Sequence, residues 1–179
     1  KKGDDLGRPY ILRFSECRNV KVRDITFRDS ARWLSHYLAC ENVIVEGISI
    51  RSPIRENRDG IGIDGCSYVR IANGHIVSGD DAIVLKSRSL KPCENVTIAN
   101  CVVSSHCNSI KMGTESGGGF ENITITNGVY YLDGTNSTWH ASNTTMSNDG
   151  TFRLDGDETI TNPTNDVDSG IWEYIGNND

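Results

Sequence analysis

The chain has 179 residues and a formal net charge of −6, with 36% hydrophobic and 7% aromatic residues. This length suits one domain with its own core, and the richness in Gly, Asn, Ser and Thr is typical of a turn-rich β protein rather than a helical bundle. The acidic balance argues against nucleic acid as a partner, and no apolar stretch reaches the roughly 18 residues of a membrane span. The chain opens at Lys1 without an initiator Met or an apolar signal core, so we interpret it as a fragment or a processed product.

One phrase recurs along the chain. It is first seen as CRNVKVRDITF (17–27) and returns as CENVIVEGISI (40–50), CSYVRIANGHI (66–76), CENVTIANCVV (93–103) and FENITITNGVY (120–130). Within each copy, apolar residues alternate and are interrupted by a Gly, Asn or Asp, which predicts a strand, a corner and a second strand. Repeats of this length built from short strands predict an all-β fold. We expect a right-handed parallel β-helix, a single-stranded β-solenoid with one copy in each coil.

The cysteines follow the same repeat. Cys17, Cys40, Cys66 and Cys93 each open a copy, and Phe120 takes that place in the fifth. This spacing favours an internal ladder of free thiols, in which Cys acts as a small hydrophobic residue. Disulfides between neighbouring coils remain the alternative. A zinc site is not expected, because the chain has no C-x₂-C pair.

A second set of strands is predicted between these copies. The segments NRDGIGIDG (57–65), SGDDAIVLKS (78–87) and HCNSIKMGT (106–114) align on one another. The alignment places Ile61, Ile83 and Ile110 in one inward column, and Gly62, Val84 and Lys111 in an outward row.

Strict alternation would also bury the acids that precede these strands. A buried, unpaired carboxylate is prohibitively costly, so we expect the chain to bend at the small residues Gly60, Ala82 and Ser109. The bend would turn Asp59, Asp80 and Asp81 toward a groove in the outer wall. Three carboxylates in one patch repel one another, so at least one should hold its proton more tightly than a free Asp.

Such a group suits glycoside hydrolysis. One carboxyl group protonates the departing sugar oxygen, and another takes a proton from the attacking water. A separation of about 6.5–9.5 Å between the two leaves room for that water and inverts the anomeric centre. His106 lies one coil further on, where it can bond to the acid or tune it.

Taken together, residues of about 10–131 resemble glycoside hydrolase family 28, the polygalacturonases and their relatives. Asn57-Arg58-Asp59 is similar to the family's N-T-D block, Gly79-Asp80-Asp81 matches its G/Q-D-D block, and Ser105-His106-Cys107 matches its G-H-G block at His. The resemblance implies that Asp80 is the general acid and that Asp59 and Asp81 position and deprotonate water. It also implies that His106 supports the acid and that no metal or other cofactor takes part.

The family's fourth block, R-I-K, has no counterpart where it is expected, at YYLDGTNSTWHASNTT (130–145). In the family its two bases hold the substrate carboxylate, and Lys111, Lys86 or Arg58 are the candidates to replace them. Asn57 is also a candidate for substrate binding. His36 lies on the equivalent strand of an earlier coil, where it either lines the groove beside Trp33 or packs in an aromatic corner.

The amino-acid composition of the chain changes near Gly134. Residues 134–179 are rich in Asn and Thr and lack Cys, so we divide the chain into coils at 1–133 and a divergent β segment or cap at 134–179 that continues the solenoid. This last part is similar to passenger repeats of bacterial surface adhesins.

Together with the acid group, the resemblance implies a pectin-type hydrolase that inverts α-linked galacturonate or rhamnogalacturonan bonds. We expect a secreted or periplasmic monomer whose partner is an acidic polysaccharide, with no nucleic acid and no membrane involved. Two alternatives remain open. One is a non-catalytic solenoid that binds polysaccharide or acts in adhesion, and the other is a polysaccharide lyase that holds Ca²⁺ on the three acids.

Overall fold

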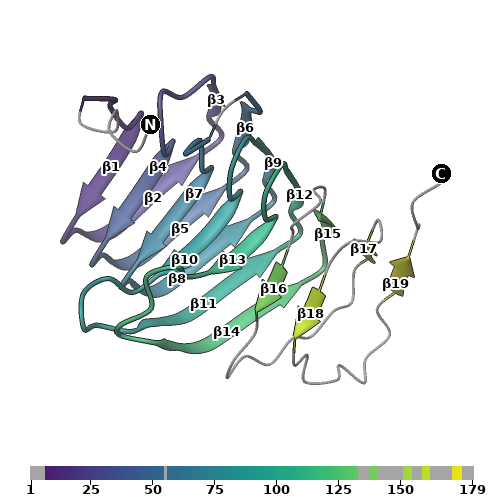
Figure 1. Ribbon diagram of the computed structural model, residues 1–179. Coiled ribbons are helices and arrows are strands. Elements are labelled where there is room, and N and C mark those ends of the chain that lie inside the picture. Colours follow the sequence, from purple (N-terminus) through teal and green to yellow (C-terminus); the bar gives the residue numbers. More distant parts are fainter. Residues whose placement is uncertain are drawn as a thin grey trace.

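The computed structural model describes residues 7–54 and 56–132, together with the strands at 138–140, 151–154, 159–161 and 171–174; side chains are described as far as residue 129. Every regular element among them is a β-strand, and every strand pairing is parallel. The chain winds through three sheets in turn and returns to the first, so that successive coils stack along one axis (Figure 1). The predicted β-solenoid is confirmed.

The three long sheets form the walls of the solenoid. Sheet A contains β1 (Leu12–Ser15), β4 (Ser35–Leu38), β7 (Ile61–Asp64), β10 (Ile83–Lys86) and β13 (Ile110–Met112). Sheet B contains β2 (Arg18–Arg23), β5 (Glu41–Glu46), β8 (Ser67–Ala72), β11 (Cys93–Ala99) and β14 (Phe120–Thr126). Sheet C contains β3 (Thr26–Arg28), β6 (Ser49–Ser52), β9 (His75–Ser78), β12 (Val102–Ser105), β15 (Val129–Leu132), β17 (Thr151–Leu154) and β19 (Ile171–Tyr174).

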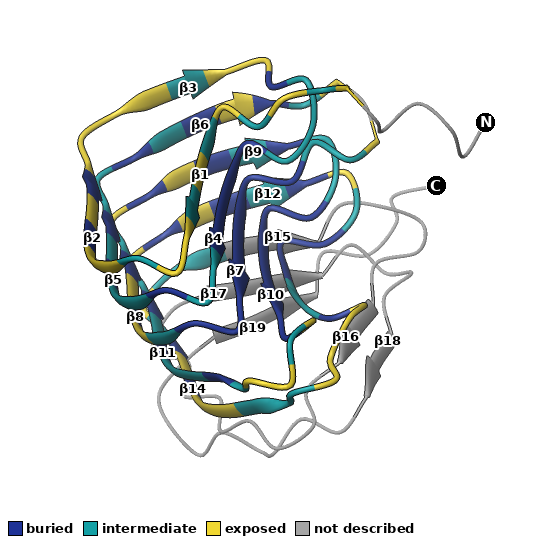
Figure 2. Ribbon diagram, turned by 90° about the vertical axis from the view of Figure 1, so that its left-hand side faces the viewer, coloured by how far each residue is buried: buried dark blue, intermediate teal, exposed yellow. Residues whose placement is uncertain are grey.

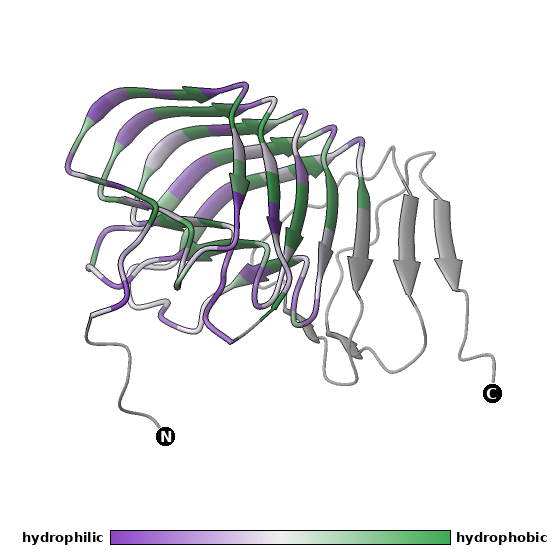
Figure 3. Cartoon of the chain, turned by 90° about the horizontal axis from the view of Figure 1, so that it is seen from above, coloured by the Kyte–Doolittle hydropathy of each residue, from purple (hydrophilic) through white to green (hydrophobic). Residues whose placement is uncertain are grey.

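The core is a set of aliphatic columns that run along the solenoid axis. In sheet A, Ile83 pairs with Ile61 on one side and Ile110 on the other, as predicted, and all three are buried. Hydrophobic segments recur at the same place in each coil, where they meet the matching segments of the next coil (Figure 3). Because stacking buries side chains that a single coil would leave in water, the coils stabilise one another.

Sheet A is covered on both faces. The strands β4, β7 and β10 are almost entirely buried (Figure 2), although only every second residue faces the core. Gly62 and Val84, which face away from the core, are therefore covered by other side chains on the outer face of sheet A.

The corner between sheets A and B carries the cysteine column. Cys40, Cys66 and Cys93 are buried, and the amide of Cys40 donates to Sγ of Cys66 at 3.3 Å. The last member, Cys93, pairs with Phe120. All six cysteines lie among the described residues and are free thiols there. The thiol ladder is thus the alternative that the structure supports.

The described residues after position 133 form four strands. β17 and β19 continue sheet C in parallel, while β16 (Thr138–His140) and β18 (Thr159–Thr161) pair with each other. The division of the chain at residues 133 and 134 stays a prediction, because most of 134–179 lies outside the described residues. Within the part that is described, the structure contains no helix that could cross a membrane.

Candidate active site

The acids reach the outer wall because the chain bends at the entrance to sheet A. Ala82 is fully buried in the core, and a Cβ placed on Gly60 would lie 3.1 Å from Cγ2 of the buried Ile76. The following residues, such as Ile83, also face the core. Two consecutive inward residues break the alternation once, so the residue before them points outward. This is the bend that the sequence predicted.

Asp81 occupies one of these outward positions and is held by the next coil. Nδ2 of Asn108 donates to its Oδ1 at 2.7 Å, and Nζ of Lys111 donates to its Oδ2 at 2.9 Å. Burial alone would lower the pKa of Lys111, but the hydrogen bond and the charge of Asp81 outweigh it and raise the pKa. Only 3% of Asp81 is exposed, so the Lys111 ammonium is its main counter-charge.

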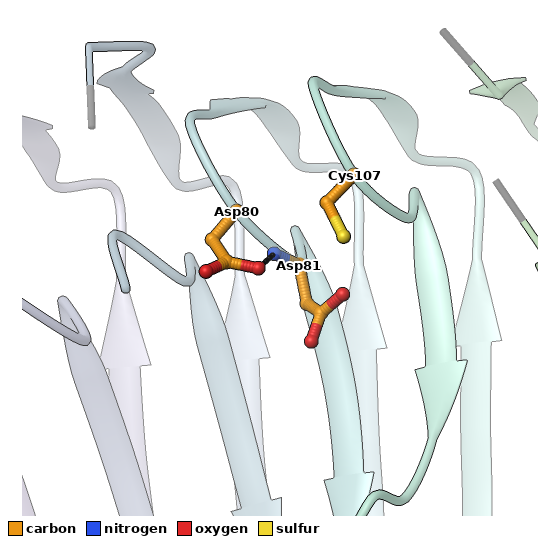
Figure 4. A group of neighbouring side chains, drawn as sticks. All are labelled: Asp80, Asp81 and Cys107. Atoms are coloured by element: carbon orange, nitrogen blue, oxygen red, sulfur yellow. Dashed lines mark hydrogen bonds between the residues drawn. The ribbon is translucent and has the colours of Figure 1, made fainter. Parts of the chain in front are cut away.

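Asp80 is fixed by backbone donors. Its Oδ2 accepts a hydrogen bond from the amide of Asn57 at 2.7 Å, and its Oδ1 accepts one from the amide of Asp81 at 2.9 Å (Figure 4). The hydroxyls of Ser78 and Ser105 both donate to its carbonyl oxygen. Three coils therefore hold this residue in one orientation.

The pKa of Asp59 is strongly perturbed. Burial, followed by the charges of Asp80 and Asp81, raises its pKa to about 8, although Lys86 and Lys111 act in the opposite direction. At neutral pH this carboxyl group is therefore mostly protonated. The sequence predicted that one acid of the patch holds its proton tightly, and the raised pKa makes Asp59 the candidate for that acid.

Cys107 completes the patch. One ligand atom from each of Asp80, Asp81 and Cys107 lies within 4.8 Å of the others, a spacing that could hold a metal ion. Burial and the charges of Asp81 and Asp80 raise the pKa of the Cys107 thiol to about 12, so the thiol stays protonated. A cation would also compete with Lys111 and Asn108 for the oxygens of Asp81. The donor set therefore fits a proton and an ammonium group better than a metal.

A second cluster covers the outer face of sheet A nearer its other end. His36 lies in its centre with no exposed surface; Tyr10 stacks on its ring at 5.5 Å and Trp33 meets it edge-on at 5.3 Å. Cζ of Arg88 and Nζ of Lys86 each lie 5.1 Å from the centroid of the Trp33 ring. The result is an aromatic platform surrounded by cations.

The cluster is anchored by a buried acid that the sequence did not single out. Asp64 is fully buried, and it accepts hydrogen bonds from Nε of Arg88 at 2.6 Å and from the amide of Arg88 at 3.0 Å. Burial would raise the pKa of Asp64, but His36 and Arg88 together hold it well below its ordinary value. Burial is also the main reason that the pKa of His36 is lowered.

Comparisons with known proteins identify the family of the chain. The family described as glycosyl hydrolases family 28 matches residues 1–129. The chain belongs to this family. Its fold is similar to the crystal structure of a hyperthermoactive exopolygalacturonase from Thermotoga maritima, with a TM-score of 0.69 and 28% identity over 94% of this chain and 41% of that chain.

Family 28 relatives with known sequences include plant enzymes. The chain is 36% identical over 81 residues to a probable polygalacturonase of Vitis vinifera and 33% identical over 82 residues to a polygalacturonase of Persea americana. These matches cover 45% of the chain in both cases, and 16% and 18% of the relatives. The chain therefore matches less than a fifth of these relatives' length.

Of the other residues in the predicted family 28 blocks, only some lie against the three acids. Asn57 contributes its backbone amide to Asp80, whereas Arg58 points to Asp29, with 3.8 Å between Nη1 and Oδ1. His106 is exposed at the same edge, and its backbone amide donates to Ser78. Among the described residues, its imidazole makes no hydrogen bond to a carboxylate, so the expected support of the acid is not seen here.

Two residues that were predicted to bind substrate, His36 and Lys86, are buried. His36 cannot touch a ligand directly, because Tyr10 and Trp33 cover it; the aromatic corner is the alternative that the structure shows. Lys86 is 5% exposed, and its Nζ donates to Glu115 at 2.7 Å. Both residues pack against Trp33 from the buried side of the platform, and Trp33 and Arg88 form its accessible part.

Proposed function

We propose that this chain is the catalytic part of a pectin-type glycoside hydrolase that cleaves α-linked galacturonate or rhamnogalacturonan with inversion. The observation that carries the proposal is the convergence of Asp59, Asp80 and Asp81 from two coils, with one proton on Asp59 and one ammonium, Lys111, on Asp81. Paired carboxyl groups in different protonation states are what hydrolysis of a glycosidic bond requires.

The roles follow from exposure and partners. Asp80 is half-buried, whereas Asp59 and Asp81 are 4% and 3% exposed, so a sugar in the groove meets Asp80 first. We assign Asp80 the donation of a proton to the departing sugar oxygen; this is the proton that the acid group holds on the neighbouring Asp59 in the free site, and it has to pass to Asp80 first. Asp81, next to Lys111, receives a proton from the attacking water, with Asp59 beside it to position that water. Each turnover therefore consumes one proton of the acid group and returns one from water.

The aromatic platform supplies the substrate contacts in this proposal. An aromatic ring such as Trp33 offers an apolar face to a sugar, and the guanidinium of Arg88 matches a uronate carboxylate. Lys111 and Lys86 add positive charge around the acids, which supports a polyanionic substrate despite the missing R-I-K block. Binding of such a polymer fits a monomeric protein that acts outside the cytoplasm, in the cell wall or the periplasm.

The test is incubation of the 179-residue chain with polygalacturonate, with and without a chelator. New reducing ends without the ultraviolet absorbance of an unsaturated uronate support hydrolysis. Absorbance that the chelator abolishes would replace the proposal with a lyase, and binding without either product would replace it with the non-catalytic alternative.

The matched variant is Asp80→Asn. Because general acid catalysis contributes about 10²–10⁴-fold, this change should lower the rate by at least about 100-fold. Asn keeps one of the two backbone hydrogen bonds that Asp80 accepts and loses the other, so circular dichroism and the melting temperature are measured to verify that the variant is folded. Full activity in this variant would show that the acid is assigned wrongly.

A further inference from the structure

A ladder of asparagine side chains runs along sheet B, far from the acids in the fold. The third residue is an asparagine in four of the five repeated phrases (Asn19, Asn42, Asn95 and Asn122), and each of these has a left-handed backbone with φ between 51° and 57°. Their side chains bond from coil to coil. Nδ2 of Asn42 donates to Oδ1 of Asn19 at 2.7 Å, and Nδ2 of Asn122 donates to Oδ1 of Asn95 at 3.1 Å.

Tyr68 interrupts this ladder in the middle coil. Its φ is 56°, which Asn tolerates easily and a bulky residue rarely adopts. Its side chain is 58% exposed, so it gains little from the protein core in return. An exposed aromatic residue that adopts an unfavourable backbone conformation without packing in the core is a reason to look for a ligand that contacts its ring.

The interruption leaves two amide groups without their ladder partners. In the direction of the existing bonds, an Asn at position 68 would donate to Oδ1 of Asn42 and accept from Nδ2 of Asn95. Tyr68 can do neither with its ring, and no bond to these two atoms occurs among the described residues. One acceptor and one donor therefore flank the exposed ring on its two sides.

These groups border an open pocket on the outer face of sheet B. It has a volume of about 520 Å³ and is lined by Asn42, Tyr68, Val69, Arg70, Asn95 and Thr97. This volume lies within the usual range for small-molecule sites. Arg70 is exposed on β8, two residues after Tyr68, and brings a guanidinium group to the same pocket.

We propose that this pocket is a second carbohydrate site, separate from the acids, that binds a uronate-containing segment of a polysaccharide. The ring of Tyr68 stacks on the apolar face of a sugar. A sugar hydroxyl donates to Oδ1 of Asn42, and another accepts from Nδ2 of Asn95. The guanidinium of Arg70 pairs with the uronate carboxylate. The site would hold a polymer on one wall while another wall cleaves it.

The choice of polygalacturonate as the probe rests on the proposed function, but the test measures binding without turnover. In native gels cast with polygalacturonate, the Asp80→Asn chain should be retarded, and addition of Tyr68→Asn should weaken retention by roughly tenfold. Tyr68→Asn restores the residue that the ladder carries elsewhere, so its melting temperature should be equal to or higher than that of the parent. A loss of binding would then not reflect misfolding.

A matched pair of variants tests the charge. Arg70→Gln should weaken binding of polygalacturonate by roughly tenfold but change binding of fully methyl-esterified pectin little. Lys21→Gln removes a cation from the same row of sheet B two coils away, outside the pocket, and should have no effect. Unchanged retention of the Tyr68→Asn chain, or equal losses in Arg70→Gln and Lys21→Gln, would overturn the proposal.

The outcome is independent of catalysis. On a short galacturonate oligomer the Tyr68→Asn single variant should keep the parent's rate, whereas on polymer at low concentration it should be slower. If the parent releases no reducing ends, the proposed function fails, while the binding comparison still decides this site.

Discussion

Replacement of Asp59 by Asn should change how the stability of the protein depends on pH. The pKa of this carboxyl group is raised from 3.8 to about 8 in the folded chain, mainly because the group is buried. Between these two values, the folded state binds one proton more than the unfolded state. The stability contributed by this proton is fully present below the unfolded pKa and is lost as the pH rises through the folded pKa.

The size of the effect follows from the shift. One pH unit corresponds to about 1.4 kcal/mol, so between about pH 5 and about pH 8 the free energy of unfolding should fall by about 4 kcal/mol through this group. Asp59→Asn removes the titration while keeping the shape of the neutral acid. The variant should match the parent near pH 5 and exceed its stability near pH 8.

Urea unfolding at both pH values, followed by circular dichroism and by tryptophan fluorescence, measures this difference. Glu121→Gln, which removes a carboxylate from an exposed position on β14, controls for the loss of one negative charge. Parallel pH profiles for the parent and Asp59→Asn would refute the assignment of the proton to Asp59. A parent that gains stability relative to the variant as the pH rises would refute the sign.

Two further substitutions and one labelling experiment probe the surroundings of the acids. Lys111→Met leaves Asp81 buried without its ammonium, and should cost about 2–4 kcal/mol in urea unfolding; adding Asp81→Asn should recover most of that loss, and a purely additive double variant would contradict the pairing. Arg88→Met removes the guanidinium hydrogen bond and charge from fully buried Asp64 and leaves it with His36 and the backbone amide of residue 88; it should cost about 3 kcal/mol, whereas a stable variant would mean that these two partners suffice. Cys107, whose pKa is raised to about 12, should react with iodoacetamide near pH 8 far more slowly than a free thiol when mapped by peptide mass spectrometry, and fast labelling would show that the site is more open than its structure.

The repeat was the part of the sequence that carried most structural information. Evenly spaced copies opened by Cys40, Cys66 and Cys93 fix which residues are neighbours between coils, because parallel strands in register translate sequence spacing directly into contacts. The cost of placing Asp59 and Asp81 in the apolar core then required a bend, and the small residues that allow it could be read from the sequence; that both acids are nevertheless buried in the outer wall could not be read from it.

The chemistry within the site could be predicted less well. The backbone donors that hold Asp80 depend on the turn around Asn57, whose φ is 60°, and this conformation has no separate signal in the sequence. The burial of His36 depends on Tyr10, a residue one coil earlier that belongs to no repeated phrase. Arg88 follows β10 in an irregular segment, so its bond to Asp64 could not be found by spacing alone.

The charges of the outer wall explain how an acid site can accept a polyanion. A polyuronate would be repelled by three ionised carboxylates, since like charges close together cost free energy in a poorly solvated groove. Here the proton on Asp59 removes one charge, and Lys111 compensates that of Asp81, so Asp80 is the acid left without a cation in direct contact among the described residues. The cations around Trp33 then give the neighbouring part of the groove the opposite sign. The burial that places the proton on Asp59 therefore serves substrate binding as well as catalysis in the proposed hydrolase.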